Sequence, residues 1–230
     1  MGRRRLFLLG GDSAAFELIA DEFVAAAGGP EAAIALLLIG GEGWERHRPA
    51  YLAPWQERGV ECCSLIVPGA EGRLDVGAAV AELRRATGMV VGGGDTLRYQ
   101  ELYATEPIRR VTREQYQRGV PYAGLSAGAM LACEVCLKRP RRPEDPPLRI
   151  LPGLGLVKGL VVGVHFSETK ALPDLLEAMR RTRIGRGLGI DEGACVMLED
   201  EEVRRVAGGS AYELRMEDFG SGRHVVKRIG

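Results

Sequence analysis

The sequence predicts an α/β fold in which helices cover both faces of a mostly parallel sheet. Four largely apolar runs in the first half of the chain, at residues 6–9, 33–39, 60–67 and 89–91, have the length and composition of buried strands. Segments with helical periodicity separate these runs, and such alternation is typical of a parallel sheet. The 230 residues contain no internal repeat and no dividing linker. We therefore expect a single domain, residues 1–230, with its ligand site at the carboxyl ends of the strands.

The expected helices begin and end at recognisable signals. Asp12 or Ser13 can cap a helix that runs to about residue 27, where Gly28-Gly29-Pro30 closes it. Such segments are long enough to connect one parallel strand to the next. The other expected helices are at residues 44–58, 76–86 and 171–183, and one more begins at Thr96.

The second half of the chain has a different character. Residues 138–147 form a charged, proline-rich segment that cannot be regular structure, and we interpret it as a surface connection, with an active-site lid as the alternative. Glycines then separate short expected strands around Val157 and Val161. Further short strands follow, and we expect residues 201–230 to be a small antiparallel extension of a core that spans about residues 5–200.

The composition is that of an ordinary globular protein, with 46% hydrophobic and 27% charged residues. Lys plus Arg equal Asp plus Glu at 31 each, so no overall field recruits nucleic acid or a membrane surface. The apolar run at residues 6–9 is too short for a signal-peptide core or a membrane span. We therefore expect a cytoplasmic protein with neither nucleic acid nor membrane as a partner, and the sequence leaves a homodimer open.

Five cysteines, an odd number, suit a reducing compartment better than a disulfide framework. Cys62-Cys63 and Cys195 lie in apolar runs, and Cys133 and Cys136 are expected on the helix that follows Ser126. We interpret them as small core residues rather than as a redox or metal pair. Neither a second pair nor a nearby histidine completes a zinc site in the sequence, so no metal is expected.

A nucleophile-elbow pattern is the most informative motif in the chain. Gly124-Leu125-Ser126-Ala127-Gly128 follows a short apolar run of strand type, at residues 120–123, and precedes a segment rich in helix formers, at residues 127–136. That strand–turn–helix context presents the serine hydroxyl at the end of the sheet. Ser126 is therefore our candidate nucleophile, and a tight βα turn without chemistry is the alternative.

A serine hydroxyl needs a base within hydrogen-bond reach, and the chain has three histidines. His47 lies between two arginines on an expected helix surface, and His224 lies in a polar strand near the C-terminus. His165 follows the strand at residues 159–164, so it lies at a carboxyl end, where the elbow also opens. His165 is our candidate base.

An acidic pair between glycines is the natural partner for this histidine. Gly189-Ile190-Asp191-Glu192-Gly193 lies between a short apolar segment and the strand expected at residues 194–198. One carboxylate of the pair is expected to fix the imidazole tautomer. The pattern itself does not choose between Asp191 and Glu192.

The stretch Gly92-Gly93-Gly94-Asp95-Thr96 supplies candidate oxyanion donors. Three glycines between a strand and a helix start let the backbone approach a ligand and point N–H groups at it. Together with the N–H of Ala127, those of Gly93 and Gly94 could bind the oxyanion of an acyl transfer. This turn, or the one at Gly10-Gly11-Asp12-Ser13, could instead bind phosphate, although neither matches a Walker or a dinucleotide-binding pattern.

Four short stretches of the chain together carry a family resemblance. They are Gly92-Gly93-Gly94-Asp95-Thr96, Gly124-Leu125-Ser126-Ala127-Gly128-Ala129, Val164-His165-Phe166-Ser167 and Gly187-Leu188-Gly189-Ile190-Asp191-Glu192. They occur in the order found in peptidase family S51, which the chain resembles over about residues 5–200. The family is the serine-nucleophile branch of the class I glutamine amidotransferase-like superfamily, and it includes dipeptidase E and cyanophycinase. The resemblance implies a flavodoxin-like fold and Glu192 as the acid that orients His165.

The chain departs from the family at positions that bear on the substrate. Dipeptidase E has an arginine for the carboxylate of an aspartyl substrate, and Lys170 stands in that place here, without the bidentate geometry of an arginine. The resemblance also places Asp95 and Thr96 in the substrate site, with Asp95 replacing the usual asparagine of dipeptidase E. Cyanophycinases carry arginines after the histidine, where this chain has Thr169, Ala171 and Asp174.

The residues and the resemblance together predict a serine peptidase that hydrolyses small peptides, Asp-containing ones included, through an acyl-enzyme. Ser126 is the nucleophile, His165 the base and Glu192 the orienting acid, and no cofactor is expected. One alternative is a cyanophycinase-like isopeptidase that acts on β-Asp-Arg peptides. The others are a non-catalytic binding member of the superfamily and a phosphate or nucleotide binder that uses the glycine turns.

Overall fold

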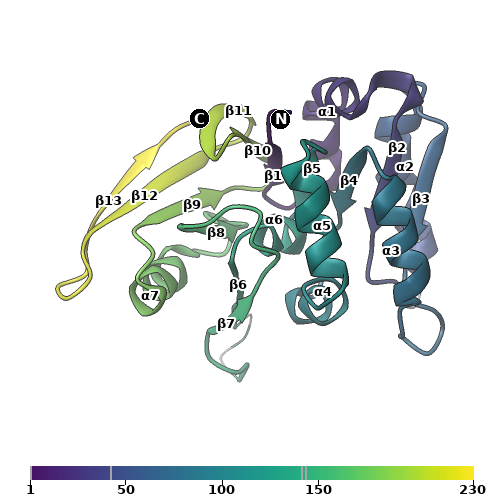
Figure 1. Cartoon of the computed structure of the whole chain (residues 1–230). Helices are drawn as coiled ribbons and strands as arrows, with labels where there is room; N and C mark the ends of the chain where they lie inside the picture. The colour runs from purple at the N-terminus through teal and green to yellow at the C-terminus, as the bar shows by residue number, and fades with distance from the viewer. Residues whose placement is uncertain (1, 42, 141, 143) are drawn as a thin grey trace.

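Two large β-sheets lie side by side in the described part of the molecule, helices pack around them, and a third sheet has only two strands (Figure 1). The computed structural model describes residues 2–41, 43–140, 142 and 144–230. The larger sheet has seven strands in the order β11-β10-β1-β5-β4-β2-β3. Its strands are β1 (Arg5–Leu9), β2 (Ala33–Leu37), β3 (Cys62–Ile66), β4 (Gly88–Val91), β5 (Tyr122–Leu125), β10 (Ala194–Glu199) and β11 (Glu202–Gly208).

The middle of the larger sheet is parallel and covered on both faces, which confirms the predicted fold class. β1, β5, β4, β2 and β3 pair in parallel, and β10 and β11 add an antiparallel edge. Alternate side chains of β1 enter different apolar clusters, Phe7 and Leu9 on one face and Leu6 and Leu8 on the other. The first face packs against α1 (Ala20–Ala27) and α2 (Arg48–Gln56), and the second against α3 (Val76–Arg85), α4 (Thr96–Tyr103) and α5 (Ile108–Gln117).

The strand that precedes His165 belongs to a second sheet, a division that the sequence did not predict. This sheet has the order β13-β12-β9-β8, in which only β8 and β9 are parallel. The expected extension at residues 201–230 is therefore divided between the two sheets, because β11 joins the larger one. The strands of the second sheet are β8 (Leu160–Val164), β9 (Arg186–Ile190), β12 (Ala211–Asp218) and β13 (Arg223–Arg228).

The two sheets meet at the carboxyl ends of β1 and β8. The His165 N–H donates to the carbonyl of Gly10, which directly follows β1, over 3.3 Å. The chain also crosses from the second sheet to the first between β9 and β10, where Asp191 and Glu192 lie. The residues that follow β1, β8 and β9 therefore lie close together, although β1 belongs to the larger sheet and β8 and β9 belong to the second.

The helix expected at residues 127–136 is shorter in the structure. α6 covers only Ala127–Leu131, and Cys133 then forms an isolated bridge with Val157, which is all that remains of the strand expected there. The chain continues into β6 (Val135–Lys138), which pairs with β7 (Arg149–Pro152). Cys136 therefore lies on a strand and not on a helix, because pairing with β7 overrides the helix preference of this segment.

Two other helices begin with a 3₁₀ turn. Residues Ser13–Leu18 precede α1, and the Asp12 side chain caps them by accepting a hydrogen bond from the Ala14 N–H over 2.9 Å. Residues Trp44–His47 likewise precede α2, whereas α7 (Leu172–Thr182) matches its expected range closely. Within the segment at 138–147, Lys138 ends β6, and residues 141 and 143 lie outside the described residues.

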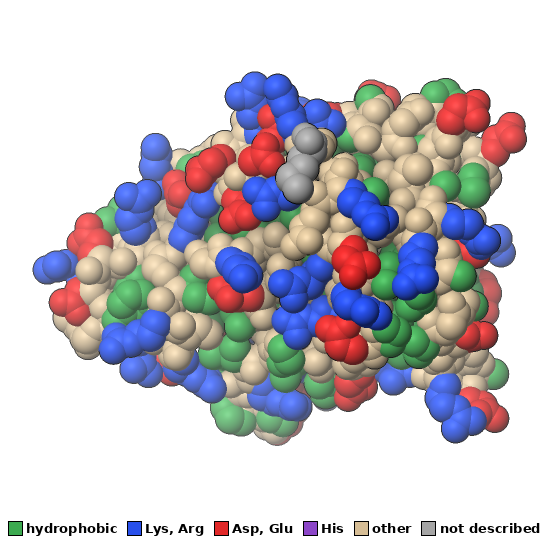
Figure 2. Space-filling model, in the orientation of Figure 1, with side chains coloured by type: hydrophobic (Ala, Val, Ile, Leu, Met, Phe, Trp, Pro, Cys, Tyr) green, Lys and Arg blue, Asp and Glu red, His purple; other side chains and the backbone are tan. Residues whose placement is uncertain are grey.

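The balanced charge of the chain is also visible on its surface. Figure 2 shows blue and red side chains interspersed over the face occupied by α5, and neither sign covers that face alone. Among the described residues, no helix combines the length and the apolar character needed to span a membrane.

Candidate active site

Ser126 lies in a sharp turn between β5 and α6, as the elbow pattern predicts. Its backbone has φ 50° and ψ −106°, a conformation that is rare for a residue with a side chain. The flanking glycines are needed for close packing: a Cβ on Gly124 would lie 2.4 Å from the Gly128 carbonyl oxygen, and one on Gly128 would lie 2.3 Å from that of Val91. The turn thus holds the nearly buried Ser126 hydroxyl at the carboxyl end of β5.

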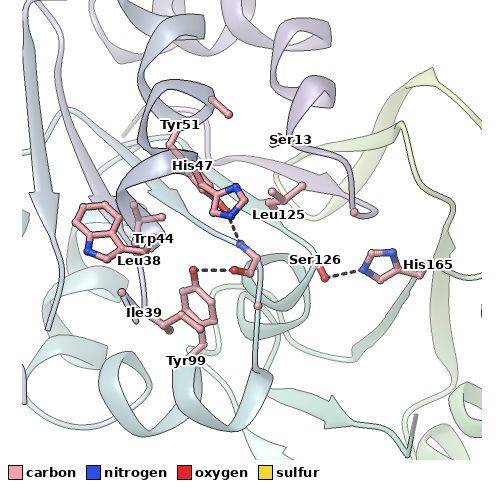
Figure 3. Close-up of a pocket in the computed structure, with 15 residues that line it drawn as sticks. Ser13, Leu38, Ile39, Trp44, His47, Tyr51, Tyr99, Leu125, Ser126 and His165 are labelled. Atoms are coloured by element: carbon pink, nitrogen blue, oxygen red, sulfur yellow. Dashed lines mark hydrogen bonds between the residues drawn. The ribbon is translucent and has the colours of Figure 1, made fainter. Parts of the chain in front are cut away.

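The structure brings His165 to this hydroxyl. Ser126 Oγ lies 2.9 Å from His165 Nε2, within hydrogen-bond distance (Figure 3). His165 has φ 47°, so it too occupies a strained backbone position, directly after β8. The Thr169 hydroxyl donates to the carbonyl of His165 over 2.6 Å and so fixes the turn that carries the imidazole.

Of the two acidic residues that the sequence left open, Glu192 is the one that contacts the imidazole. His165 Nδ1 lies 2.6 Å from Glu192 Oε1. Asp191 points elsewhere, because its carboxylate accepts the Ser167 N–H over 2.8 Å. A carboxylate can only accept hydrogen bonds, so Nδ1 carries the proton and Nε2 of a neutral imidazole is free to accept from Ser126.

The glycine turn after β4 is held by two tyrosines that the sequence did not single out. The Gly93 N–H donates to the Tyr51 hydroxyl over 3.1 Å, and the Tyr99 hydroxyl donates to the Gly93 carbonyl over 3.3 Å (Figure 3). Burial raises the pKa of Tyr51, against the lowering effect of the Gly93 N–H, so its hydroxyl is neutral at physiological pH. The turn is therefore fixed by uncharged partners.

Backbone N–H groups also surround the nucleophile. The first N–H groups of a helix have no acceptor within the helix. In α6 the Gly128 N–H donates to Gly92 and the Ala129 N–H to Ser126, and for Ala127 no acceptor is found within the described part of the chain. For the Gly94 N–H, likewise, no acceptor is found in that part, whereas the Gly93 N–H donates to the Tyr51 hydroxyl.

Two cavities open on either side of Ser126, and both include Ser126, His165 and Gly94 in their walls. One has a volume of about 420 Å³ and a largely aromatic and apolar lining. The other has a volume of about 550 Å³ and contains the cations Lys138 and Arg139. The reacting groups therefore lie where the two cavities meet.

The three residues predicted to bind substrate, Asp95, Thr96 and Lys170, differ in their position relative to the two cavities. Thr96 lines the larger cavity. Asp95 caps α4 by accepting the Arg98 N–H and pairs with Lys138; burial opposes ionisation, but these bonds hold the pKa of Asp95 below its ordinary value. Lys170 is exposed, and the linings described for the two cavities do not include it. Its positive φ turns the chain at the start of α7 instead.

Lys138 and Arg139 are site residues that sequence reasoning missed. The segment at 138–147 was interpreted as a surface connection, yet both side chains line the larger cavity. Arg139 is anchored by Asp174 over 2.9 Å and by the Thr169 hydroxyl over 2.8 Å. The only available sequence signal was that these cations directly follow a short apolar run, which here is a strand leading to the site.

The remaining histidines and the cysteines have simpler environments. His47 is exposed as expected, but it also lies in the wall of the smaller cavity, whereas His224 is exposed on β13. All five cysteines are free; Cys62 is exposed and Cys63 half-buried, so these two are not the core residues that we expected. Burial raises the pKa of Cys136 to about 12, so this thiol stays protonated. Within the described ranges, no cluster of three or more His, Cys, Asp or Glu residues is arranged to hold a metal.

The turn at Gly10-Gly11 packs against the imidazole of His165. A Cβ on Gly11 would lie 2.2 Å from His165 Cε1 and 2.4 Å from its Nδ1, so the ring packs directly on this backbone. We expect Gly11→Ala to displace the imidazole from Ser126 and Glu192, and to slow labelling of Ser126 by a fluorophosphonate at least about 10²-fold, the typical cost of a misplaced catalytic group. Gly185→Ala, where the nearest atom is 3.9 Å away, is the control. Wild-type labelling of the Gly11 variant would contradict this role.

Comparison with known proteins places the chain in a family. The model of peptidase family S51 matches residues 71–206. The chain is 29% identical over 195 residues to a cyanophycinase from Synechococcus elongatus, and 26% identical over 140 residues to a peptidase E from Nostoc sp.. These alignments cover 83% and 56% of this chain, and the chain spans only 60% and 56% of the lengths of these two relatives.

Solved structures show the same fold. A peptidase from an acI-B1 Actinobacterium superposes with a TM-score of 0.64 at 17% identity, over 92% of this chain and 87% of the other. A putative peptidase E from Listeria monocytogenes EGD-e gives a TM-score of 0.59 at 14% identity, over 90% of this chain and 100% of the other. At such identities the likeness concerns the fold alone. The family model, however, covers more than half of the chain and includes Ser126, His165 and Glu192, so the chain belongs to peptidase family S51.

Proposed function

We propose that this chain is a serine peptidase that hydrolyses small peptides through an acyl-enzyme. The observation that carries the proposal is the pair of short contacts made by His165, 2.9 Å to Ser126 Oγ and 2.6 Å to Glu192 Oε1. A nucleophile bonded to a base, which is in turn oriented by a carboxylate, is the arrangement that activates a serine hydroxyl. Membership of peptidase family S51 supports the same reaction class.

The steps use only groups of the chain and water. Ser126 Oγ attacks the scissile carbonyl carbon while its proton passes to His165 Nε2, and the carbonyl oxygen becomes an oxyanion. His165 then returns the proton to the leaving amine as the C–N bond breaks, which leaves an ester on Ser126. Water, deprotonated by His165, attacks this ester and regenerates the serine. Glu192 accepts the Nδ1–H throughout and stabilises the imidazolium that forms in each half-reaction.

The oxyanion is bound, in this proposal, by backbone N–H groups of Gly94 and Ala127. Both flank Ser126, one on the glycine turn after β4 and the other at the start of α6. Gly93 positions the turn through Tyr51 and Tyr99, and its own N–H becomes a donor when the Tyr51 bond is exchanged. One such donor contributes about 3–4 kcal/mol to transition-state stabilisation.

The larger cavity supports an acidic group in the substrate. Lys138 and Arg139 lie in its wall beside Ser126 and His165, and although each already pairs with a carboxylate, Asp95 and Asp174 respectively, a substrate carboxylate can accept from their remaining N–H donors. This assigns to residues 138 and 139 the role that the sequence had suggested for Lys170. Preference for an Asp residue next to the scissile bond is therefore part of the proposal.

A second candidate is an isopeptidase that acts on β-Asp-Arg peptides, because several relatives of the chain are named cyanophycinase. Such a substrate places a guanidinium near the site. The described wall of the larger cavity includes Lys138 and Arg139 but neither Asp95 nor Asp174, so a guanidinium would meet the cations first and would pair with either aspartate only by displacing them.

Labelling and a matched substrate panel test both candidates. We expect a fluorophosphonate to label Ser126 of the wild-type chain, and Asp-Leu to be hydrolysed at least about tenfold faster than the isosteric Asn-Leu, since losing one charged contact costs 1.4 kcal/mol or more. Mass spectrometry locates the label, and amine release measures hydrolysis. Equal rates for the two dipeptides would remove the acidic preference. Faster cleavage of β-Asp-Arg would favour the isopeptidase, and an unlabelled serine in folded protein would make the chain a non-catalytic member.

A further inference from the structure

The smaller of the two cavities beside Ser126 has a cluster of aromatic and aliphatic side chains in its wall. Trp44, Tyr51 and Tyr99 line it together with Leu38 and Ile39, and Figure 3 shows these side chains gathered on the side of Ser126 away from His165. Among the lining residues that the structure describes, none is Asp, Glu, Lys or Arg, and the ionisable imidazoles in the wall are those of His47 and His165. We call this cavity the aromatic cavity.

The two sides of the nucleophile therefore differ in chemistry. The larger cavity presents Lys138 and Arg139, whereas the aromatic cavity presents mainly rings and aliphatic groups together with the imidazole of His47. A Lys or Arg side chain that entered the aromatic cavity would lose its hydration without gaining a carboxylate partner, and an acidic side chain would find only the imidazoles of His47 and His165 among the described lining residues. An apolar or aromatic side chain would instead leave water and contact ring faces.

The aromatic cavity also borders the reacting atoms directly. Gly93, which forms part of its wall, lies so close to the nucleophile that an added Cβ would be 3.4 Å from Ser126 Cβ. Tyr51 and Tyr99 hold both polar groups of this glycine's peptide backbone. A group in the cavity thus belongs to the residue adjoining the scissile bond, not to a distant part of the substrate.

We propose that the aromatic cavity is a specificity subsite for an uncharged apolar or aromatic side chain of the substrate. The inference rests on the proposed serine-peptidase function, because it assigns one side of the same site. Its volume of about 420 Å³ accommodates a phenyl-bearing side chain. The preferred peptides then carry an acidic residue on one side of the scissile bond and a large apolar residue on the other.

Two sulfonyl fluorides test the subsite without reference to any peptide. In each reaction a bond forms between Ser126 Oγ and sulfur, the S–F bond breaks with release of fluoride, and the hydroxyl proton passes to His165 Nε2. Phenylmethanesulfonyl fluoride carries a phenyl group that can occupy the aromatic cavity, whereas methanesulfonyl fluoride carries only a methyl group. The rate of inactivation by the phenyl reagent, divided by the rate for the methyl reagent, therefore measures how much binding of the phenyl group in the cavity contributes. Changes in the reactivity of Ser126 affect both rates and cancel in this ratio.

Trp44→Ala and Ile39→Ser each replace a half-buried side chain in the wall of the aromatic cavity. Both variants are therefore expected to fold, and melting curves check this. We expect each to lower the ratio of the two rates about tenfold, the lower end of what one apolar group in a pocket contributes to discrimination. Val225→Ala is the control, since it shortens an exposed apolar side chain on β13, far from the site (Figure 1).

The outcomes separate the subsite from the proposed function. A lower ratio in both variants, with an unchanged ratio in Val225→Ala, supports the subsite. Unchanged ratios in both variants, with Ser126 still sulfonylated by both reagents, overturn the subsite and leave the serine-peptidase function in place. If neither reagent modifies Ser126 in the folded wild-type chain, the function itself fails, and the subsite fails with it.

Discussion

Replacing Ser126 by alanine is expected to lower kcat for peptide hydrolysis by about 10⁶-fold, as removal of the nucleophile of a serine hydrolase does. The hydroxyl supplies the bond to the substrate carbon, and no other group of the site can take over that step. The variant should retain its fold, because the elbow is held by backbone contacts such as the bond from the Ser126 N–H to the Leu9 carbonyl, 2.9 Å long. The measurement is amine release from Asp-Leu, together with a melting curve.

A matched control is available on the loop after His165. Ser167 is exposed, and its hydroxyl contacts only the Tyr212 hydroxyl, over 3.3 Å, in the described part of the chain. Ser167→Ala therefore removes the same atom from the same residue type without touching Ser126, and wild-type turnover is expected. If Ser126→Ala kept more than about a hundredth of the wild-type rate, the proposed nucleophile would be wrong, since only residual binding effects survive its loss.

The middle of the larger sheet could be predicted because its inner strands, β1, β2, β4 and β5, are buried on both faces. The run at 33–39 is apolar without interruption, and the observed parallel strands lie within or beside such runs. β9 was missed because two of its five residues, Gly187 and Gly189, have low strand preference. The structure needs glycine there: a Cβ on Gly189 would lie 2.5 Å from the Phe166 ring. That requirement comes from tertiary packing, which the local pattern does not contain.

The candidate site could be predicted only in part, for a similar reason. Ser126 and His165 follow recognisable strands, so the pattern located them. Two adjacent carboxylates on one turn give no sign of which one faces the imidazole, and the choice of Glu192 came from the family resemblance. Tyr51 and Arg139 reach the site from a helix and a loop that are distant in sequence, and their positions depend on how those elements pack.

The adjacent acids allow a matched test of the orienting carboxylate. Glu192→Gln keeps the size of the side chain but gives it N–H donors, so it can stabilise the tautomer in which Nε2 carries the proton and cannot accept from Ser126. We expect kcat to fall about 10²- to 10³-fold, less than the ~10⁴-fold typical of a buried triad carboxylate. The smaller effect follows from exposure, because the Glu192 side chain is 52% accessible and water screens its interaction with the imidazole.

Asp191→Asn makes the same chemical change one residue earlier in the chain. Asp191 is buried and accepts the Ser167 N–H, and the amide oxygen of asparagine can accept the same bond. We therefore expect a lower melting temperature but a kcat within about threefold of wild type, since the loss concerns the strength of one hydrogen bond rather than the tautomer of His165. Both variants are assayed with Asp-Leu across pH 5 to 9, where kcat reports the ionisation of the base in the complex. A larger loss of kcat in Asp191→Asn than in Glu192→Gln would assign the orienting role to Asp191, and with it a rearrangement of the turn between β9 and β10 during catalysis.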